Sequence, residues 1–202
     1  MTLNNRGTLF IISGPSGAGK GTVLGRVMQN RDDLFVSISA TTRQPREGEV
    51  DGVNYYFVSK KRFEEMIAAQ QVLEYACYCG NYYGTPLEAV EQRLAQGMNV
   101  ILEIEVVGAA KVKTIKPDAV SIFITPPSMQ VLEKRLRDRG TETEEVIRGR
   151  LDTARREIQE IDKYDYIVIN DELETAVGEL ETIIDSQRYR AANRSESIKG
   201  GF

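Results

Sequence analysis

Four short apolar runs are spread along the chain and predict buried β-strands. They cover residues 8–13, 100–104, 120–124 and 166–169, and each is bounded by polar or turn-forming residues. Such bounded apolar runs are typical of strands that are covered on both faces. Because helical patterns lie between the runs, we expect a parallel sheet with helices on both sides.

Helical signals fill the spaces between these runs. Residues 23–28 place their apolar side chains at helical spacing. Thr85 and Glu88 have the spacing of a capping box, with Pro86 as the first helical residue. Ser128 can cap a further helix. The remaining helices are expected at residues 144–160 and from residue 172 onward.

Residues 39–84 interrupt the alternation of strands and helices. This stretch contains short aromatic-rich segments, turn signals at residues 47–48 and 51–52, and a short helical pattern around Phe63. We therefore expect a small mixed α+β unit inserted into the core fold.

A glycine-rich loop joins the first predicted strand to the first predicted helix. It reads Gly14-Pro15-Ser16-Gly17-Ala18-Gly19-Lys20-Gly21-Thr22. In this context the spacing is the signature of a P-loop, whose backbone N–H groups bind phosphates while Lys20 reaches the β and γ oxygens. The usual hydroxyl directly after the lysine is replaced by Gly21. We therefore expect Thr22 to hydrogen-bond a phosphate and the loop not to ligate Mg²⁺ directly.

Composition narrows the possible chemistry. The chain has 202 residues and a net charge of −4, which argues against wholesale binding to nucleic acid or an anionic membrane. The absence of histidine excludes a histidine base or a histidine-ligated metal. Cys77 and Cys79 are expected to be reduced thiols on one face of a strand, because CxC is neither a usual zinc spacing nor a usual redox spacing. The apolar run at residues 9–12 is too short for a signal peptide or a membrane span, so we expect a cytoplasmic enzyme.

A second cluster of residues could bind another phosphate. Arg43 and Arg46 flank Pro45, and two guanidinium groups at this spacing can converge on one anion. Tyr55 and Tyr83 could donate hydroxyl hydrogen bonds to the same group. Exposed arginines in loops are usually solvated, so these residues alone leave both interpretations open.

Four segments, in this order, resemble the guanylate kinase family. They are residues 14–22, the run T-T-R-x-P-R-x-G-E at residues 41–49, Gly80-Asn81-Tyr82-Tyr83-Gly84, and Arg139-Gly140-Thr141-Glu142-Thr143-Glu144-Glu145. The resemblance extends over about residues 7–187. It implies Mg²⁺-dependent transfer of the γ-phosphoryl group of ATP to GMP, and to dGMP, in purine nucleotide metabolism and GMP recycling.

The resemblance also implies a division of the chain. Residues 1–38, 86–137 and 154–190 would form a P-loop core, residues 39–85 a GMP-binding insertion, residues 138–153 a lid and residues 191–202 a flexible tail. The expected fold class is α/β. It combines a three-layer α/β/α core around a parallel sheet with a small mixed α+β domain and a short helical lid.

Individual roles follow from the resemblance in the same way. The residues implied in catalysis are Lys20, Arg43, Arg139 and Arg150. ATP would be bound by the nine residues of the P-loop together with Arg135, Arg139 and Asn170. GMP would be bound by Ser39, Arg43, Arg46, Tyr55, Glu74, Tyr83, Thr85 and Glu105. Mg²⁺ would be held mainly by phosphates and water, without a direct protein ligand.

The chemistry of Glu74 supports its assignment independently. Guanine offers two adjacent donors, N1–H and the exocyclic amine, which one carboxylate can accept together. A site built on such bonds can reject the wrong analogue by about 10⁴–10⁵. Glu105 stands where the family usually has aspartate, and strand alternation places Glu103 on the same face. Which of these two reads guanine and which orders water around Mg²⁺ stays open.

Arg135 and Arg139 are four residues apart and share a helical face, while Arg150 follows on the next predicted helix. The alternative to a phosphate-binding lid is a solvated basic stripe.

Two other functions compete with a GMP kinase. One is a kinase of AMP, CMP, UMP or a deoxynucleotide, and the other is a non-catalytic module of the same fold that binds a phosphorylated protein. Glu74 and the tyrosine-rich segment at residues 80–84 argue against the first, and the P-loop with both arginine clusters argues against the second. The expected partners are ATP and GMP, without nucleic acid or membrane, and self-association as a homo-oligomer stays open.

Overall fold

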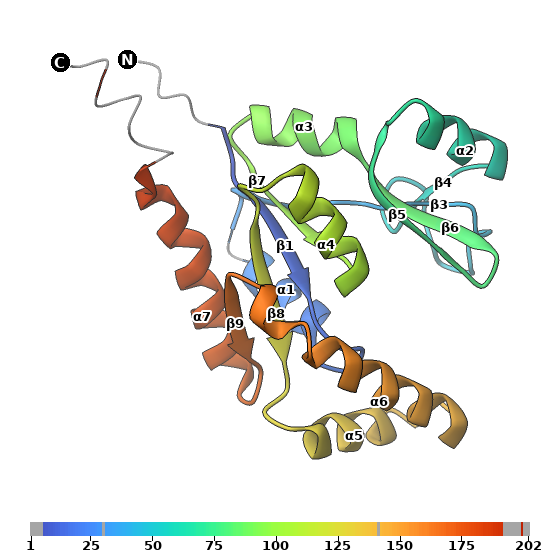
Figure 1. Cartoon of the computed structure of the whole chain (residues 1–202), viewed down its shortest axis with the longest axis vertical. Coiled ribbons are helices and arrows are strands. Elements are labelled where there is room, and N and C mark those ends of the chain that lie inside the picture. The colour runs from blue at the N-terminus through green and yellow to red at the C-terminus, as the bar shows by residue number, and fades with distance from the viewer. Residues whose placement is uncertain (1–5, 30, 141, 192–198, 200–202) are drawn as a thin grey trace.

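A five-stranded parallel sheet forms the centre of the molecule (Figure 1). The computed structural model describes residues 6–29, 31–140, 142–191 and 199. The sheet order is β2-β7-β1-β8-β9, with parallel neighbours throughout. Its strands are β1 (Leu9–Ser13), β2 (Leu34–Val36), β7 (Asn99–Glu103), β8 (Val120–Thr125) and β9 (Tyr166–Ile169). The four predicted strands are confirmed, and β2 is an additional strand of only three residues.

Helices cover both faces of this sheet because its strands carry apolar side chains on both sides. The helices are α1 (Lys20–Met28) and α7 (Leu173–Ser186) on one face, and α3 (Leu87–Ala95) and α4 (Val106–Ile115) on the other (Figure 1). Phe10 and Ile12 of β1 pack with α1 and α7, whereas Leu9 and Ile11 pack with α3 and α4. The predicted three-layer α/β/α core is therefore confirmed.

The start of α3 differs from the capping box expected at Thr85. Thr85 and Pro86 belong to β6 (Asn81–Pro86), and the helix begins at Leu87. The Thr85 hydroxyl donates to Oε1 of Glu74 at 2.9 Å. Pairing of β6 with its neighbouring strand keeps Thr85 extended, so its side chain bonds a buried carboxylate rather than the helix terminus.

Between β2 and α3 the chain forms a small unit with its own sheet, which confirms the expected mixed insertion. The sheet order is β4-β3-β6-β5, and the pairs β3–β6 and β5–β6 are antiparallel. Its elements, besides β6, are β3 (Ala40–Thr41), β4 (Tyr56–Phe57), α2 (Lys60–Ala68) and β5 (Val72–Tyr78). Ala40, Phe63 and Met66 form its buried centre, where Phe63 stacks on Tyr82 at 5.2 Å between ring centroids.

The connection from β5 to β6 corrects the expectation for the two cysteines. Cys77 lies on β5, but Cys79 lies in the following turn, with a left-handed φ of 48°. Both are free and exposed thiols in the described structure. The turn therefore places them on different elements rather than on one strand face.

A helical hairpin projects from the core next to the P-loop (Figure 1). It consists of α5 (Met129–Asp138) and α6 (Glu144–Ile158). Ser128 caps α5 as predicted, by accepting a hydrogen bond from the Val131 N–H at 3.2 Å. Leu132 and Leu136 of α5 pack against Leu151 of α6, so the two helices share a small apolar core of their own.

Two short helical turns flank the last strand and the last helix of the core. These are the 3₁₀ helices η1 (Ile161–Lys163) and η2 (Gln187–Tyr189), before and after β9 and α7. The tail predicted over residues 191–202 lies, apart from residues 191 and 199, outside the described residues. No helix in the described part of the chain is long and apolar enough to cross a membrane.

We expect Phe63→Ala to lower the free energy of unfolding by about 3–5 kcal/mol, because it removes a fully buried ring and leaves a cavity. Urea unfolding followed by circular dichroism measures this change. Val53→Ala is the control in the same unit: Val53 is 66% exposed, and its truncation should change stability by less than about 0.5 kcal/mol. A loss below about 1 kcal/mol for Phe63→Ala would show that the small unit does not depend on this core.

Candidate active site

The P-loop is pressed against the ends of β8 and β9, and this contact requires glycine at two positions. At Gly14 the φ angle is 142°, and a Cβ atom would lie 1.9 Å from the carbonyl oxygen of Ile124. At Gly19 the φ angle is 88°, and a Cβ atom would lie 2.4 Å from Nδ2 of Asn170. That amide group donates to the carbonyl oxygen of Ala18 at 2.8 Å. The end of β9 therefore supports the loop directly.

Lys20 opens α1, and its ammonium group is folded back onto the loop. Its Nζ donates to the carbonyl oxygens of Gly14 at 2.6 Å and Pro15 at 3.2 Å. Burial lowers the pKa of Lys20, and the carboxylates of Glu103 and Glu157 oppose this shift. Phosphate oxygens bound at the loop would give this partly desolvated ammonium charged acceptors in place of carbonyl groups.

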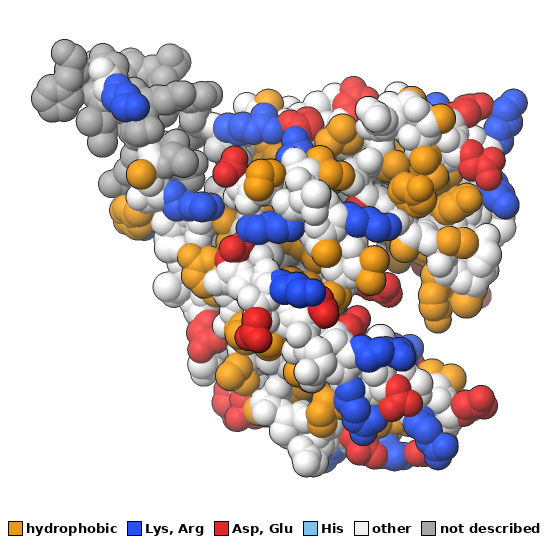
Figure 2. Space-filling model, viewed as in Figure 1, with side chains coloured by type: hydrophobic (Ala, Val, Ile, Leu, Met, Phe, Trp, Pro, Cys, Tyr) orange, Lys and Arg blue, Asp and Glu red, His pale blue; other side chains and the backbone are white. Residues whose placement is uncertain are grey.

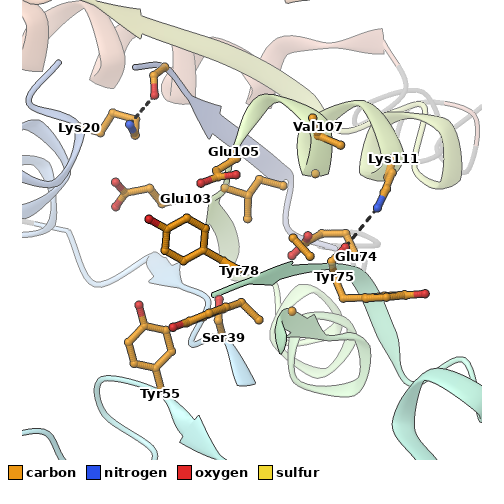
Figure 3. Close-up of a pocket in the computed structure, with 16 residues that line it drawn as sticks. Lys20, Ser39, Tyr55, Glu74, Tyr75, Tyr78, Glu103, Glu105, Val107 and Lys111 are labelled. Atoms are coloured by element: carbon orange, nitrogen blue, oxygen red, sulfur yellow. Dashed lines mark hydrogen bonds between the residues drawn. The ribbon is translucent and has the colours of Figure 1, made fainter. Parts of the chain in front are cut away.

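The P-loop lies between two cavities. The larger, of about 590 Å³, opens between the core and the small unit (Figure 3). The predicted site residues that line it are Gly14, Lys20, Ser39, Tyr55, Glu74, Tyr83 and Glu105. The smaller cavity, of about 420 Å³, lies beside the α5–α6 hairpin. The predicted residues there are Gly17, Gly19, Thr22, Arg135, Arg139 and Asn170.

The surface is hollowed between the small unit and the hairpin, as Figure 2 shows. The loop presents Lys20 to the larger cavity and Thr22 to the smaller one. The loop therefore contributes side chains to both cavities.

The arginines of the T-T-R-x-P-R-x-G-E motif are joined by its final glutamate. Nη1 and Nη2 of Arg43 contact the two carboxylate oxygens of Glu49 at 2.9 and 2.8 Å. The backbone N–H of Arg46 donates to the same carboxylate at 2.7 Å. The Arg43 bond, followed by that of Arg46, lowers the pKa of Glu49 to about 2. The Tyr55 ring lies 5.5 Å from the Arg43 guanidinium carbon and meets Tyr83 edge to face.

The two arginines themselves lie outside the lining of the larger cavity, and Arg46 is an exposed loop residue. In the structure the Arg43 side chain lies beside Tyr55 and Tyr83. Arg46 contacts this group only through its backbone N–H, which donates to Glu49.

Glu74 provides a buried carboxylate in the wall of the larger cavity. The residue is 8% exposed, and its Oε1 accepts the hydrogen bond from Thr85. Its Oε2 lies against α4 at Gly108, where a Cβ atom would be 3.0 Å away. Burial raises the pKa of Glu74, and the Thr85 bond opposes this shift. The carboxylate is therefore costly to ionise unless further donors or cations reach it.

Glu103 and Glu105 both face the larger cavity, although they do not share a strand as expected. β7 ends at Glu103, and Glu105 is the residue that precedes α4 (Figure 3). Of the carboxylates that act on the Lys20 ammonium, Glu103 has the largest effect. Glu105 acts on Lys20 as well, and by like-charge repulsion it also acts on Glu74. Glu105 is therefore within electrostatic reach of both the loop and the buried carboxylate.

Arginines of the helical hairpin surround the other side of the P-loop. Arg135 and Arg139 both line the smaller cavity, in agreement with their shared helical face. Nη2 of Arg135 donates to the backbone carbonyl of Asn170 at 2.9 Å. Arg150 of α6 hydrogen-bonds the hydroxyl of Ser16 in the loop. Both helices of the hairpin therefore reach the phosphate-binding segment.

Three residues of the site were not singled out from the sequence. Glu49 lies inside a recognised motif, but its partner Arg43 becomes evident only from the folded loop. Glu157 of α6 is half-buried and acts electrostatically on Lys20. Lys111 of α4 lines the larger cavity. The last two sit on helices whose approach to the site depends on tertiary packing, so no local pattern identifies them.

No three histidine, cysteine, aspartate or glutamate side chains in the described ranges are grouped so that they could hold a metal ion.

Comparison with known proteins identifies close relatives. The sequence model of the guanylate kinase family matches residues 6–187. A guanylate kinase of Clostridium perfringens strain SM101 is 50% identical over 195 residues, which cover 96% of this chain and 90% of the relative. One from Desulfitobacterium hafniense strain Y51 is 50% identical over 196 residues, or 97% and 98% of the two chains. The crystal structure of guanylate kinase from Anaplasma phagocytophilum superimposes with a TM-score of 0.74 at 30% identity, over 95% of this chain and 91% of the other.

We expect Gly19→Ala to weaken binding of a non-hydrolysable nucleoside triphosphate at least about tenfold, because the added Cβ collides with Asn170 at a left-handed φ. Isothermal titration calorimetry measures the affinity. Gly25→Ala is the matched control, since a Cβ there meets no described heavy atom within 4 Å beyond the helix itself. Unchanged affinity in Gly19→Ala would contradict the contact between the loop and β9.

Proposed function

The chain belongs to the guanylate kinase family and is an ATP:GMP phosphotransferase, and we propose that it transfers the γ-phosphoryl group with Mg²⁺ to GMP and dGMP. This reaction would serve purine nucleotide metabolism, including the recycling of GMP, in the cytoplasm. The observation that carries the proposal is the position of the P-loop between two cavities. A donor on one side and an acceptor on the other would meet at Lys20.

ATP occupies the smaller cavity in this proposal. Its phosphates lie on backbone N–H groups of the P-loop, at the positive end of the α1 dipole. Arg135, Arg139 and Arg150 supply charge from the hairpin, which is supported by their contacts beside the loop. Asn170 meets the adenine edge, and its bond to the loop explains how it would be held for that contact.

GMP occupies the larger cavity. Its phosphate is bound by Arg43, Arg46, Tyr55 and Tyr83, and its guanine by Ser39, Glu74, Thr85 and Glu105. The two hydrogen bonds from Arg43 to Glu49 hold the guanidinium group in place beside Tyr55 and Tyr83. An arginine held in this way loses little further entropy when it meets a phosphate.

The transfer step needs charge and alignment rather than a general base. A phosphate oxygen of GMP attacks the γ-phosphorus of ATP, the bond to the bridging oxygen breaks, and ADP leaves. The transition state is loose, with charge on the equatorial oxygens, so Lys20, Arg43, Arg139 and Arg150 act by stabilising that charge. Residues 39–85 would close as the GMP-binding domain and residues 138–153 as the lid over the core (residues 1–38, 86–137 and 154–190). Closure excludes water, which is the competing acceptor.

The residues around Lys20 fit a metal ion held by phosphates and water. When bound with ATP, Mg²⁺ neutralises charge on the β and γ phosphates. Glu103 would accept hydrogen bonds from its water shell, since this carboxylate acts most strongly on the Lys20 ammonium. Glu105, which acts on Glu74, is then assigned to guanine.

Lys20→Ala and Arg46→Ala should each lower kcat/KM by at least about tenfold, because each removes charge from a bound phosphate. A coupled assay of ADP release from ATP, Mg²⁺ and GMP measures the rates. Lys61→Ala, at an exposed position of α2, is the control and should match the wild type. If either site variant kept its full kcat/KM, the role given to that residue would be wrong.

Glu74→Gln should raise KM for GMP at least about tenfold without raising KM for ATP, because the amide nitrogen would face a guanine donor. The same assay with GMP, AMP, CMP and UMP as acceptors should show turnover with GMP and little with the others. Equal losses for ATP and GMP would indicate a folding defect rather than a specificity role. Binding of a phosphopeptide without turnover would favour the non-catalytic alternative.

A further inference from the structure

Lys111 stands in the wall of the larger cavity, next to the residue that reads guanine. It projects from α4, and its Nζ donates to the carbonyl oxygen of Tyr75 at 3.2 Å (Figure 3). The same ammonium lies 5.5 Å from the centroid of the Tyr75 ring. Lys111 and Glu74 line the same cavity, and the charge of Lys111 acts on the Glu74 carboxylate.

We propose that Lys111 is a positioning residue for specificity, which keeps Glu74 ionised so that it accepts both guanine donors. The inference rests on the proposed role of Glu74 in binding GMP. Lys111 would act through Glu74 and would not need to touch the nucleotide.

The packing of α4 on β5 makes this arrangement possible. Gly108 lies one helical turn before Lys111, on the same face of α4. A Cβ atom at Gly108 would lie 3.0 Å from Oε2 of Glu74, so the bare glycine lets the helix approach the carboxylate closely. The close approach of α4 at Gly108 thus determines how near Lys111 lies to the Glu74 carboxylate.

The groups around Glu74 have opposing effects on its pKa. Burial raises its pKa most; Thr85 of β6 opposes this with a hydrogen bond, Lys111 opposes it with its charge, and Glu105 at the start of α4 adds repulsion. Glu103 and Lys20 line the same cavity, and the charge of Glu103 acts on Lys20. Together with the Thr85 bond, Lys111 therefore opposes the effects of burial and of Glu105 on the pKa of Glu74.

The protonation state of Glu74 decides whether guanine can bind. An ionised carboxylate accepts N1–H and the amine together, whereas a protonated one places an O–H donor against these donors. Removing Lys111 raises the pKa of Glu74 further, so the protonated fraction grows as the pH falls. Affinity for GMP should then be lost toward acidic pH and regained toward alkaline pH.

A purely mechanical role predicts a different result. The bond from Lys111 to Tyr75 also joins a core helix to the small unit. If this bond served only as a tether, its loss would change KM for GMP equally at every pH. The pH profile therefore separates the two roles.

The experiment compares Lys111→Met and Lys111→Arg with the wild type, as KM for GMP and for ATP between about pH 5.5 and about pH 8.5. For Lys111→Met we expect KM for GMP to rise at least about threefold at the acidic end and to approach the wild-type value at the alkaline end. KM for ATP should follow the wild type, and Lys111→Arg should keep the wild-type profile because it keeps the charge.

Lys60→Met is the matched control. Lys60 stands 6.0 Å from the ring centroid of Tyr82 in the same unit, outside the cavity lining, and its loss should leave KM for GMP unchanged. A double variant, Glu74→Gln with Lys111→Met, should show no loss beyond Glu74→Gln alone, because Lys111 acts through Glu74.

A rise in KM that is the same at all pH values, additive losses in the double variant, or no change in Lys111→Met would each overturn the proposal. Thermal unfolding of each variant shows whether it is folded, and Lys111→Gln replaces Lys111→Met if the latter is unstable. A failure of the proposed function itself is distinguishable, because Glu74→Gln would then leave KM for GMP unchanged.

Discussion

The side-chain amide of Asn170 fixes the P-loop to the end of β9, by donating a hydrogen bond to the Ala18 carbonyl oxygen at 2.8 Å. This bond is possible because Gly19 leaves no Cβ in the way, and because β9 ends at the same edge of the sheet as β1. All five strands run parallel, so their carboxyl ends deliver the loop, Glu103 and Asn170 to one place. The hairpin reaches the same point through Arg135, whose guanidinium bonds the Asn170 carbonyl. The donor side of the site therefore depends on one buried amide.

Along the larger cavity, three carboxylates lie between two ammonium groups. Lys20 at the loop is followed by Glu103, and Glu105 and Glu74 are followed by Lys111 at the far wall (Figure 3). Burial lowers the pKa of Lys20 and raises that of Glu74, so each ion depends on its neighbours of opposite sign to stay charged. In the proposed function, the loop end of this row would meet phosphates and its far end would meet the guanine base.

The fold and most of the site could be predicted because the decisive signals are local. The glycine-rich loop and the buried strands are read from contiguous residues. The structure confirms the strands and the position of the loop between β1 and α1. β2 was missed because three residues carry too little pattern, and α4 because its apolar residues are not confined to one face. Thr85 was misread because a capping motif and a strand-end hydroxyl have the same local sequence; its partner Glu74 is 11 residues away on another strand. Glu157 and Lys111 depend on how whole helices pack, which no short pattern encodes.

The bond between Arg43 and Glu49 bears on how the small unit would close over the P-loop. Glu49 holds Arg43 in a two-point contact that resembles the one a phosphate would make, and Arg43 lies outside the cavity lining. Tyr55 and Tyr83, however, do line the cavity and pack around that guanidinium. In the proposed reaction, the Arg43 charge is held at the rim of the cavity and would reach the transferred phosphoryl group when the small unit moves toward the loop. The same movement would narrow the opening to water, so that binding of GMP and protection of ATP would be one event.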